Sequence, residues 1–368
     1  MICSDILKQE EKAAFRLRSL YRSFGYLPYK MSKFEEYEYY IRNKDFLVSD
    51  RFITFNDTNG KLMALKPDVT LSIIKNCQPV PGCKQKVCYD ENIYRPSQSS
   101  RQFKEIRQAG LECIGDIDLY DIFEVVTLAA RSLEMLGQDY VLQISHLGIL
   151  SQLLASTCSD TGFHQAAISC IAQKNEHDLL RLCQRWQVAP EKQEQLCRFL
   201  GLYGSPRTVL EQLQSLGGGL AENALSELAQ LSQLLESTPF AHKIHLDFSV
   251  VNNMNYYDGI VFTGFLSGIS GSILAGGQYG KLMRKLGCSA NAIGFALYLD
   301  LLEQRPAPGQ GYDVDVLLVY GENTDPGTVA RQVADLTAEG KTVSAQRSIP
   351  PKLRYRQLIR LEKEGVSC

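Results

Sequence analysis

Residues 86–115 read KVCYDENIYRPSQSSRQFKEIRQAGLECIG, a pattern that predicts two extended segments joined by a polar loop. Alternate side chains of a strand share one face, so Gln108 and Glu112 are predicted to lie on the same side of the second segment. They would stand about 13 Å apart, at roughly 3.3 Å per residue. Gly110 lies between them without a side chain. The pattern therefore predicts an open floor between an amide and a carboxylate, with room for a small ligand that carries a positive amine.

On these residues alone, an exposed sheet face with a glycine-weakened strand is the simpler interpretation. A second segment bears on the choice. Residues 51–74 predict a hairpin with its turn at 57–60, and the hairpin leads into a predicted helix that begins near Asp68 and Thr70. In isolation these two residues are best explained as helix caps. The ligand site is favoured only when the whole chain is considered.

Composition sets the broad class. The chain has 368 residues, of which 45% are hydrophobic and 22% charged, as in ordinary globular proteins. Its 39 basic and 41 acidic residues nearly cancel, so no overall charge favours nucleic acid. The 11 cysteines include no C-x-x-C pair, which indicates reduced thiols. We find no apolar run of about 20 residues and no signal-peptide pattern, and therefore expect a cytoplasmic protein without a membrane span.

The pattern of apolar residues predicts an α+β protein with two domains, 1–310 and 311–368. The first domain is expected to contain a helical insertion at about 147–240, and the second a small β-α-β unit followed by a charged tail. A linker is predicted at 305–311. The other predicted elements of the first domain are helices at 4–24 (capped by Ser4 or Asp5) and 118–136, a strand at 140–144, two strands around a turn at 268–271, and a buried strand or helix at 292–302.

Two apparent motifs are rejected. Gly276, Gly280 and Lys281 resemble a phosphate-binding loop, but the spacing is one residue short and Leu282 replaces the hydroxyl that would hold magnesium. His242 and His245 form H-x-x-H, which in a strand would point to opposite faces and could not share a metal. The sequence therefore predicts no metal site, no cofactor and no catalytic triad.

Four separated segments, in the same order along the chain, resemble the catalytic domain of class II aminoacyl-tRNA synthetases, and within that class histidyl-tRNA synthetase. LMALKPDVT resembles the family's Leu-Arg-Pro-Glu-x-Thr, and FKEIRQAGLECIG resembles the second arm of its strand-loop-strand motif. NYYDGIVF resembles the histidine-specific Asp-Tyr-Tyr-x-Gly-x-x-Phe, and AGGQYGKLM with AIGFAL resembles the last motif. The resemblance implies an antiparallel sheet flanked by helices. It also implies that 311–368 is a remnant of an anticodon-binding domain.

In that family, the matching positions hold the amino acid. Carboxylates and a hydroxyl suit a protonated amine, while tyrosines offer a flat wall and a phenol for an imidazole. By this resemblance the candidate histidine-binding residues are Asp68, Thr70, Gln108, Glu112, Tyr256 and Tyr257.

The resemblance breaks down at the positions that activate the amino acid with ATP, a reaction that needs fixed positive charge. Asn252 and Leu301 stand where the family has arginines, and Ser97 stands where an acidic residue reads adenine. Gln278 and Gly280 replace an Arg and an Asp in the glycine-rich corner. Arg95 is the one candidate for a remaining phosphate contact. These departures imply a protein that has no catalytic residues of its own.

A chain with an amino-acid pocket and no activating charges resembles the regulatory subunits of ATP phosphoribosyltransferase, which are histidyl-tRNA synthetase paralogues. The resemblance implies a hetero-oligomer with a short catalytic subunit, L-histidine as a feedback effector of histidine biosynthesis, and a homodimer core. Ser32 replaces the proline that is typical of the dimer-forming motif. The alternatives are a diverged histidyl-tRNA synthetase and a synthetase-like histidine- or RNA-binding module. The near-neutral charge argues against tRNA as a partner.

Overall fold

The computed structural model describes residues 7–47, 51–77, 80–97, 102–216, 221–251, 254, 256–304 and 312–361. The chain divides into two compact units, Met1–Arg305 and Pro306–Cys368. No helix in the described ranges is long and apolar enough to cross a membrane. The predicted linker at 305–311 lies outside the described residues.

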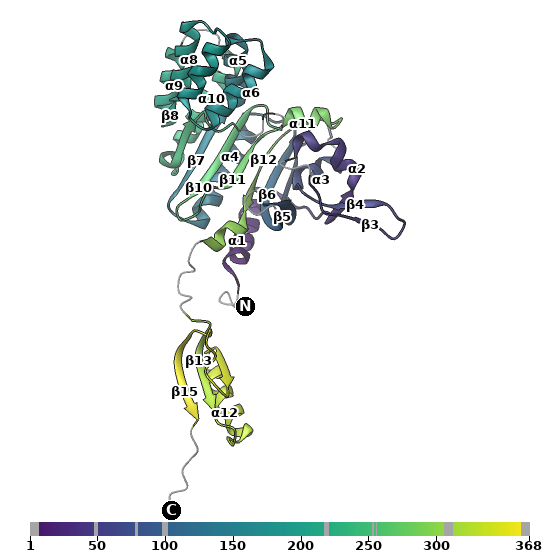
Figure 1. Ribbon diagram of the computed structural model, residues 1–368, viewed down its shortest axis with the longest axis vertical. Coiled ribbons are helices and arrows are strands. Elements are labelled where there is room, and N and C mark those ends of the chain that lie inside the picture. The colour runs from purple at the N-terminus through teal and green to yellow at the C-terminus, as the bar shows by residue number, and fades with distance from the viewer. Residues whose placement is uncertain are drawn as a thin grey trace, which may run out of the picture. The chain divides into compact units, whose positions relative to one another are not determined.

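A nine-stranded sheet forms the centre of the first unit, in the order β1-β5-β6-β12-β11-β10-β7-β9-β8 (Figure 1). Two neighbouring pairs, β1 with β5 and β7 with β9, are parallel, and the others are antiparallel. In chain order the strands are β1 (Leu27–Pro28), β5 (Gln85–Pro96), β6 (Phe103–Gly115), β7 (Tyr140–His146), β8 (Tyr203–Gly204), β9 (Ile244–Asp247), β10 (Ile260–Leu266), β11 (Ser272–Gln278) and β12 (Asn291–Tyr298).

Strands β5 and β6 are the two extended segments predicted from the sequence, and they pair along their whole length. The sheet therefore confirms the predicted α+β class. Residues 292–302, predicted as a strand or a helix, form most of β12 and then enter the 3₁₀ turn η4 (Leu299–Gln304).

Helices α1 (Gln9–Ser23) and α4 (Leu119–Leu136) pack on one face of the sheet, against alternate residues of β6 that include Leu111 and Cys113. Helix α4 begins after Asp118, as predicted, because the Asp118 carboxylate accepts the backbone N–H groups of Tyr120 and Asp121. Helix α1 starts at Gln9, later than the predicted start at 4. The backbone N–H of Lys8 is bound by the Glu11 carboxylate, which fixes this start. The predicted caps Ser4 and Asp5 lie outside the described residues.

Shorter elements cover the other face of the sheet. Helices α3 (Val69–Lys75) and α11 (Gly280–Lys285) share an apolar cluster with Val87, Tyr89 and Ile114 of β5 and β6. A three-stranded sheet lies beside them, in the order β2-β4-β3. Its elements, with the adjoining helix and turn, are β2 (Phe34–Glu36), α2 (Tyr37–Arg42), η2 (Lys44–Phe46), β3 (Thr54–Asn56) and β4 (Leu62–Leu65). Strands β3 and β4 form the predicted hairpin, whose turn is closed by Asp57 Oδ1, which accepts the backbone N–H groups of Asn59 and Lys61.

The chain between β7 and β9 is mostly helical, as predicted, and gathers at one end of the sheet (top of Figure 1). The predicted break at 217–219 lies outside the described residues. The helices, with a short turn before β9, are α5 (Leu147–Thr157), α6 (Thr161–Ala172), α7 (Glu176–Arg185), α8 (Pro190–Leu200), α9 (Pro206–Ser215), α10 (Glu222–Glu236) and η3 (Ala241–Lys243).

The second unit contains β13 (Val314–Tyr320), α12 (Pro326–Ala338) and β14 (Val343–Gln346), which form the predicted parallel β-α-β unit. The prediction of a charged tail was wrong for part of its length. β15 (Tyr355–Leu361) pairs in parallel with β13, which is the central strand of this sheet. The half-buried residues of β15 are Tyr355, Leu358, Ile359 and Leu361, which do not alternate, and the exposed Arg356 and Arg360 interrupt them, so the sequence gives little sign of a strand.

Candidate ligand-binding pocket

All six residues predicted to bind histidine line one cavity of about 450 Å³ on the α3 side of the sheet. β6 supplies Gln108 and Glu112, the start of α3 supplies Asp68 and Thr70, and the segment before β10 supplies Tyr256 and Tyr257. The structure therefore brings together segments separated by almost 190 residues of chain. Further lining residues that bear on the chemistry are Tyr89, Arg95, Tyr279, Gly294 and Tyr298.

Glu112 is the buried acid of this pocket. Thr70 Oγ1 donates a hydrogen bond of 2.8 Å to Oε1 of Glu112, and the Tyr279 hydroxyl donates one of 2.6 Å to Oε2. Burial, opposed by the hydrogen bonds from Tyr279 and Thr70, raises the pKa of Glu112 to about 8. The surroundings that the chain itself supplies therefore favour the neutral carboxylic acid near pH 7. A bound ammonium group would favour the ionised form, so the site is suited to a positively charged ligand.

Asp68 has the capping role that its sequence context indicated. Its Oδ1 accepts the backbone N–H of Leu71 at 3.0 Å, and its Oδ2 accepts Arg95 Nη2 at 3.0 Å. Arg95 Nε also donates to the carbonyl of Pro67 at 2.6 Å. Arg95 is the only cationic side chain among the described lining residues, and two acceptors of the α3 segment already hold it. Asp68 and Arg95, given separate roles by the resemblance, thus bind each other.

Three tyrosines form an aromatic wall. The rings of Tyr256 and Tyr257 have centroids 4.6 Å apart, and Tyr256 and Tyr279 lie 5.8 Å apart. Burial raises the pKa of each of these phenols well above its ordinary value, so each keeps its proton and can donate a hydrogen bond. A ligand could stack a planar ring against this wall and accept a hydrogen bond from one of its phenols at a polar atom.

The open floor predicted above Gly110 is absent. Tyr89 lies opposite Gly110 on β5, and its hydroxyl donates to the Phe295 carbonyl at 3.4 Å. A Cβ atom at position 110 would overlap both of these groups. The glycine is needed for the close approach of Tyr89 and β12, so the ligand space is bounded by Tyr89 instead of lying over bare backbone.

The positions that depart from the synthetase pattern have structural contacts where they are described. Leu301 packs against the main apolar core. Gln278 Oε1 accepts the backbone N–H of Ile260 at 2.5 Å, and the backbone N–H of Gly280 donates to Asp258 Oδ1 at 3.1 Å. Ser97 directly follows β5, and Asn252 lies outside the described residues.

Sequence reasoning missed Tyr89, Tyr279 and Tyr298 as pocket residues. Strand register explains two of them, because Tyr89 pairs with Gly110 and Tyr298 with Gln108. The sequence cannot give a register across the polar loop between β5 and β6, or between β6 and β12, which lie far apart in the chain. For Tyr279 a signal was present: it is the aromatic residue within the glycine-rich AGGQYGKLM segment that the resemblance had already singled out.

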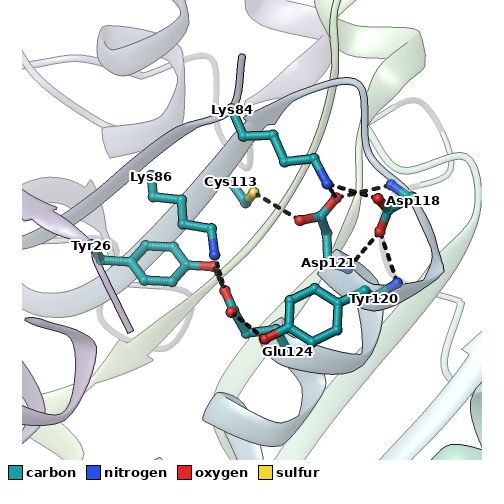
Figure 2. A network of polar contacts seen from close by, with 8 residues as sticks. All are labelled: Tyr26, Lys84, Lys86, Cys113, Asp118, Tyr120, Asp121 and Glu124. Atoms are coloured by element: carbon teal, nitrogen blue, oxygen red, sulfur yellow. Dashed lines mark hydrogen bonds and ion pairs between the residues drawn. The ribbon is translucent and has the colours of Figure 1, made fainter. Parts of the chain in front are cut away.

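A polar network on the opposite face of the sheet holds β5 and β6 against α4 (Figure 2). Lys84 Nζ binds Asp118 Oδ2 at 2.8 Å and Asp121 Oδ2 at 2.5 Å. Glu124 Oε1 accepts Lys86 Nζ at 2.6 Å and the Tyr26 hydroxyl at 3.1 Å. Because Lys84 and Lys86 flank the start of β5, the network fixes the strands behind the pocket.

The sheet of mainly antiparallel strands, with a polar pocket on the face covered by α3 and α11, defines a class II aminoacyl-tRNA synthetase-like domain. The Histidyl-tRNA synthetase family model matches residues 4–302. The chain belongs to this family.

Among curated proteins, the chain is similar to relatives named ATP phosphoribosyltransferase regulatory subunit. The relative from Alkaliphilus metalliredigens is 28% identical over 298 residues, covering 78% of this chain and 74% of the relative. The relative from Caldanaerobacter subterraneus subsp. tengcongensis is 27% identical over 336 residues, covering 89% and 87%.

Solved structures show the same fold. An ATP phosphoribosyltransferase regulatory subunit/histidyl-tRNA synthetase from Bacillus halodurans has a TM-score of 0.75 at 22% identity, covering 96% of this chain and 93% of that one. A chain of the ATP phosphoribosyl transferase (HisG:HisZ) complex from Thermotoga maritima has a TM-score of 0.63 at 20% identity, covering 79% and 97%. Histidyl-tRNA synthetase from Nostoc sp. PCC 7120 has a TM-score of 0.67 at 20% identity, covering 93% and 83%.

Proposed function

We propose that this chain is the non-catalytic regulatory subunit of ATP phosphoribosyltransferase, required by a short catalytic subunit and for histidine feedback on the first step of histidine biosynthesis. The observation that carries the proposal is the composition of the pocket. It contains a buried acid and a tyrosine wall, but Arg95 is its only described lining cation and is bound by Asp68 and Pro67. The names of the relatives support the same conclusion.

The pocket does not favour synthetase activity. Formation of an aminoacyl-adenylate proceeds by attack of the amino-acid carboxylate on the α-phosphorus of ATP. It builds negative charge on the phosphate oxygens and on the departing pyrophosphate, which fixed cations must stabilise. Leu301 supplies packing in place of a charge, and Gln278 supports the backbone of Ile260. We therefore propose that the chain charges no tRNA and that 311–368 is a remnant of an anticodon-binding domain.

Histidine suits the pocket on chemical grounds. Its ammonium group would ionise Glu112, and its imidazole could lie against Tyr256 and Tyr257 while a phenol donates to a ring nitrogen. Gln108 offers an amide that can bind either charged group of the amino acid. Feedback also requires that histidine bind two states of the assembled enzyme unequally. We propose a homodimer of this chain within a cytoplasmic hetero-oligomer as that assembly.

The test is phosphoribosyl-ATP formation from ATP and phosphoribosyl diphosphate by the same organism's short catalytic chain. Activity would be measured with and without this protein across a histidine titration. We expect activity only in the presence of this chain, and inhibition as histidine rises. Activity that is indifferent to this chain would contradict the proposal.

A parallel assay tests the alternative that this chain is a diverged histidyl-tRNA synthetase. Histidine-dependent exchange between ATP and pyrophosphate reports aminoacyl-adenylate formation directly. We expect no exchange above that of a buffer control. Exchange by this chain alone would show that the pocket activates histidine in spite of its replaced charges.

A further inference from the structure

Two cysteines from distant parts of the chain line one small cavity at the ends of α3 and α11. Cys77 follows the end of α3, and Cys288 follows the end of α11. Both line a cavity of about 350 Å³ and pack against the same apolar cluster. Both are free thiols that are neither fully buried nor fully exposed. The proposed function uses neither of them.

The backbone holds both cysteines in place. The Cys77 N–H donates to the Ile74 carbonyl at 3.0 Å, and the Cys288 N–H donates to the Met283 carbonyl at 2.9 Å. Each cysteine is thereby fixed to the last turn of its helix. Burial and the neighbouring Cys288 thiol raise the pKa of Cys77 to about 11, so Cys77 is a protonated thiol near pH 7. Cys77 Sγ also donates to Gln85 Oε1 at 3.2 Å.

We propose that Cys77 and Cys288 are a modification site that forms a reversible intramolecular disulfide by exchange with a low-molecular-weight disulfide of the glutathione type. The Cys288 thiolate attacks one sulfur of the small disulfide and releases one small thiolate, which takes up the proton that Cys288 lost. Cys77 then loses its proton, attacks Cys288 Sγ of the mixed disulfide and releases the second small thiol. The two protein thiols are oxidised, and one small disulfide is reduced to two thiols.

The assignment of Cys288 as the first nucleophile follows from the environment of Cys77. A thiol with a raised pKa is rarely a thiolate, and thiolate is the attacking species. Cys77 is therefore suited to the second, intramolecular step, where the mixed disulfide is held beside it. Once formed, the bond would join the ends of α3 and α11.

The position of this bond relates it to the ligand pocket. Thr70 lies at the start of α3 and Tyr279 directly precedes α11, and these two residues donate the hydrogen bonds to Glu112. Each helix is only about 10 Å long at roughly 1.5 Å per residue, so a bond at their far ends restrains both donors. This link to histidine response rests on the proposed function, whereas disulfide formation does not.

The chemical test treats the purified full chain with glutathione disulfide, alkylates the remaining thiols and maps the peptides by mass spectrometry. We expect a Cys77–Cys288 cross-link that reductant removes. Cys77→Ser and Cys288→Ser should each abolish it. Cys83→Ser is the matched control and should leave the cross-link in place. Cys83 is an exposed cysteine, so it would be the main site of reaction if accessibility alone decided reactivity. Recovery of both thiols in alkylated form, or pairing of either with another cysteine, would overturn the proposal.

A second set of measurements tests the cross-link and the proposed function independently of each other. Oxidation should raise the Tm of the wild-type chain and of Cys83→Ser but not that of Cys288→Ser. The Cys77–Cys288 bond would close a long loop and thereby restrict the unfolded chain. In the assembled enzyme, oxidation should shift the histidine concentration for half-inhibition in the same two proteins. A mapped cross-link without that shift would overturn the link to the pocket. Absence of any histidine inhibition would overturn the proposed function and leave the cross-link standing.

Discussion

Gly294 lies directly opposite Glu112 on the neighbouring strand, and the carboxylate of Glu112 occupies the space that a side chain at 294 would fill. A Cβ atom at 294 would overlap Oε2 of Glu112, the atom that accepts the Tyr279 hydroxyl. The glycine on β12 is thus part of the acid site, although it contributes no functional group.

Gly294→Ala should displace the Glu112 carboxylate and break its hydrogen bond with Tyr279. We expect a loss of about 1–3 kcal/mol in the free energy of unfolding, as for other overpacked buried sites, together with a weaker histidine response. Gly201→Ala is the control. Gly201 has a φ of −78°, and a Cβ there would meet nothing closer than 3.6 Å. Equal stability of the two variants in denaturant titrations would show that β12 can move away without cost.

Glu112→Gln should change how stability depends on pH. The pKa of Glu112 is about 8 in the folded chain and close to its ordinary 4.5 when unfolded. Between these values the folded chain holds a proton that the unfolded chain has lost, so the free energy of unfolding falls as pH rises. The fall should level off above about pH 8, and the Gln variant should lack it. The fluorescence of Trp186, the single tryptophan, can follow unfolding over this pH range. Parallel pH curves for the two proteins would refute the shifted pKa.

Glu112→Ala and Tyr257→Ala should weaken histidine inhibition while leaving assembly with the catalytic subunit intact. The first removes the acid that balances an ammonium group, and the second removes part of the aromatic wall. We expect at least a tenfold rise in the half-inhibitory concentration, equivalent to about 1.4 kcal/mol. Tyr312→Ala, at an exposed tyrosine of the second unit, is the control. Unchanged inhibition in both pocket variants would place the effector site elsewhere in the complex.

Lys86→Ala should destabilise the first unit by about 2–3 kcal/mol, because it leaves the buried Glu124 carboxylate without its cation (Figure 2). The Lys86 side chain is partly exposed, so water would compensate some of the loss. Arg42→Ala removes the cation of an exposed ion pair with Glu38 and should cost less than about 1 kcal/mol. Thermal unfolding of both variants would compare the two sites. A similar small effect at Lys86 would mean that Tyr26 and Tyr120 alone satisfy Glu124.

The sequence predicted best those elements whose signals are local. The helix expected at 118–136 forms as α4, because the Asp118 side chain caps its start and Gly137 follows its last residue. The turn at 57–60 and the helix at 326–338 likewise carry their own Asp, Gly or Pro signals. The common face of Gln108 and Glu112 followed from strand periodicity alone, and both line the pocket.

What the sequence could not predict depends on strand register and on contacts between separate segments. Tyr89 takes the space above Gly110 only because β5 and β6 pair in one particular register. The pairing of Asp68 with Arg95 joins two residues whose separate patterns suggested separate roles. β15 depends on pairing with β13, and its mixed apolar and basic residues give little local evidence for a strand.

The nine-stranded sheet ends on each side in a strand of two residues, β1 and β8. Long open edges expose rows of free backbone groups that can recruit strands from other chains and seed aggregation. Here one edge strand contains Pro28, which has no N–H to offer, and the other ends at Gly204, whose φ of +146° departs from ordinary strand geometry. A strand from a neighbouring molecule would therefore find only a short and irregular template on either of these two edge strands.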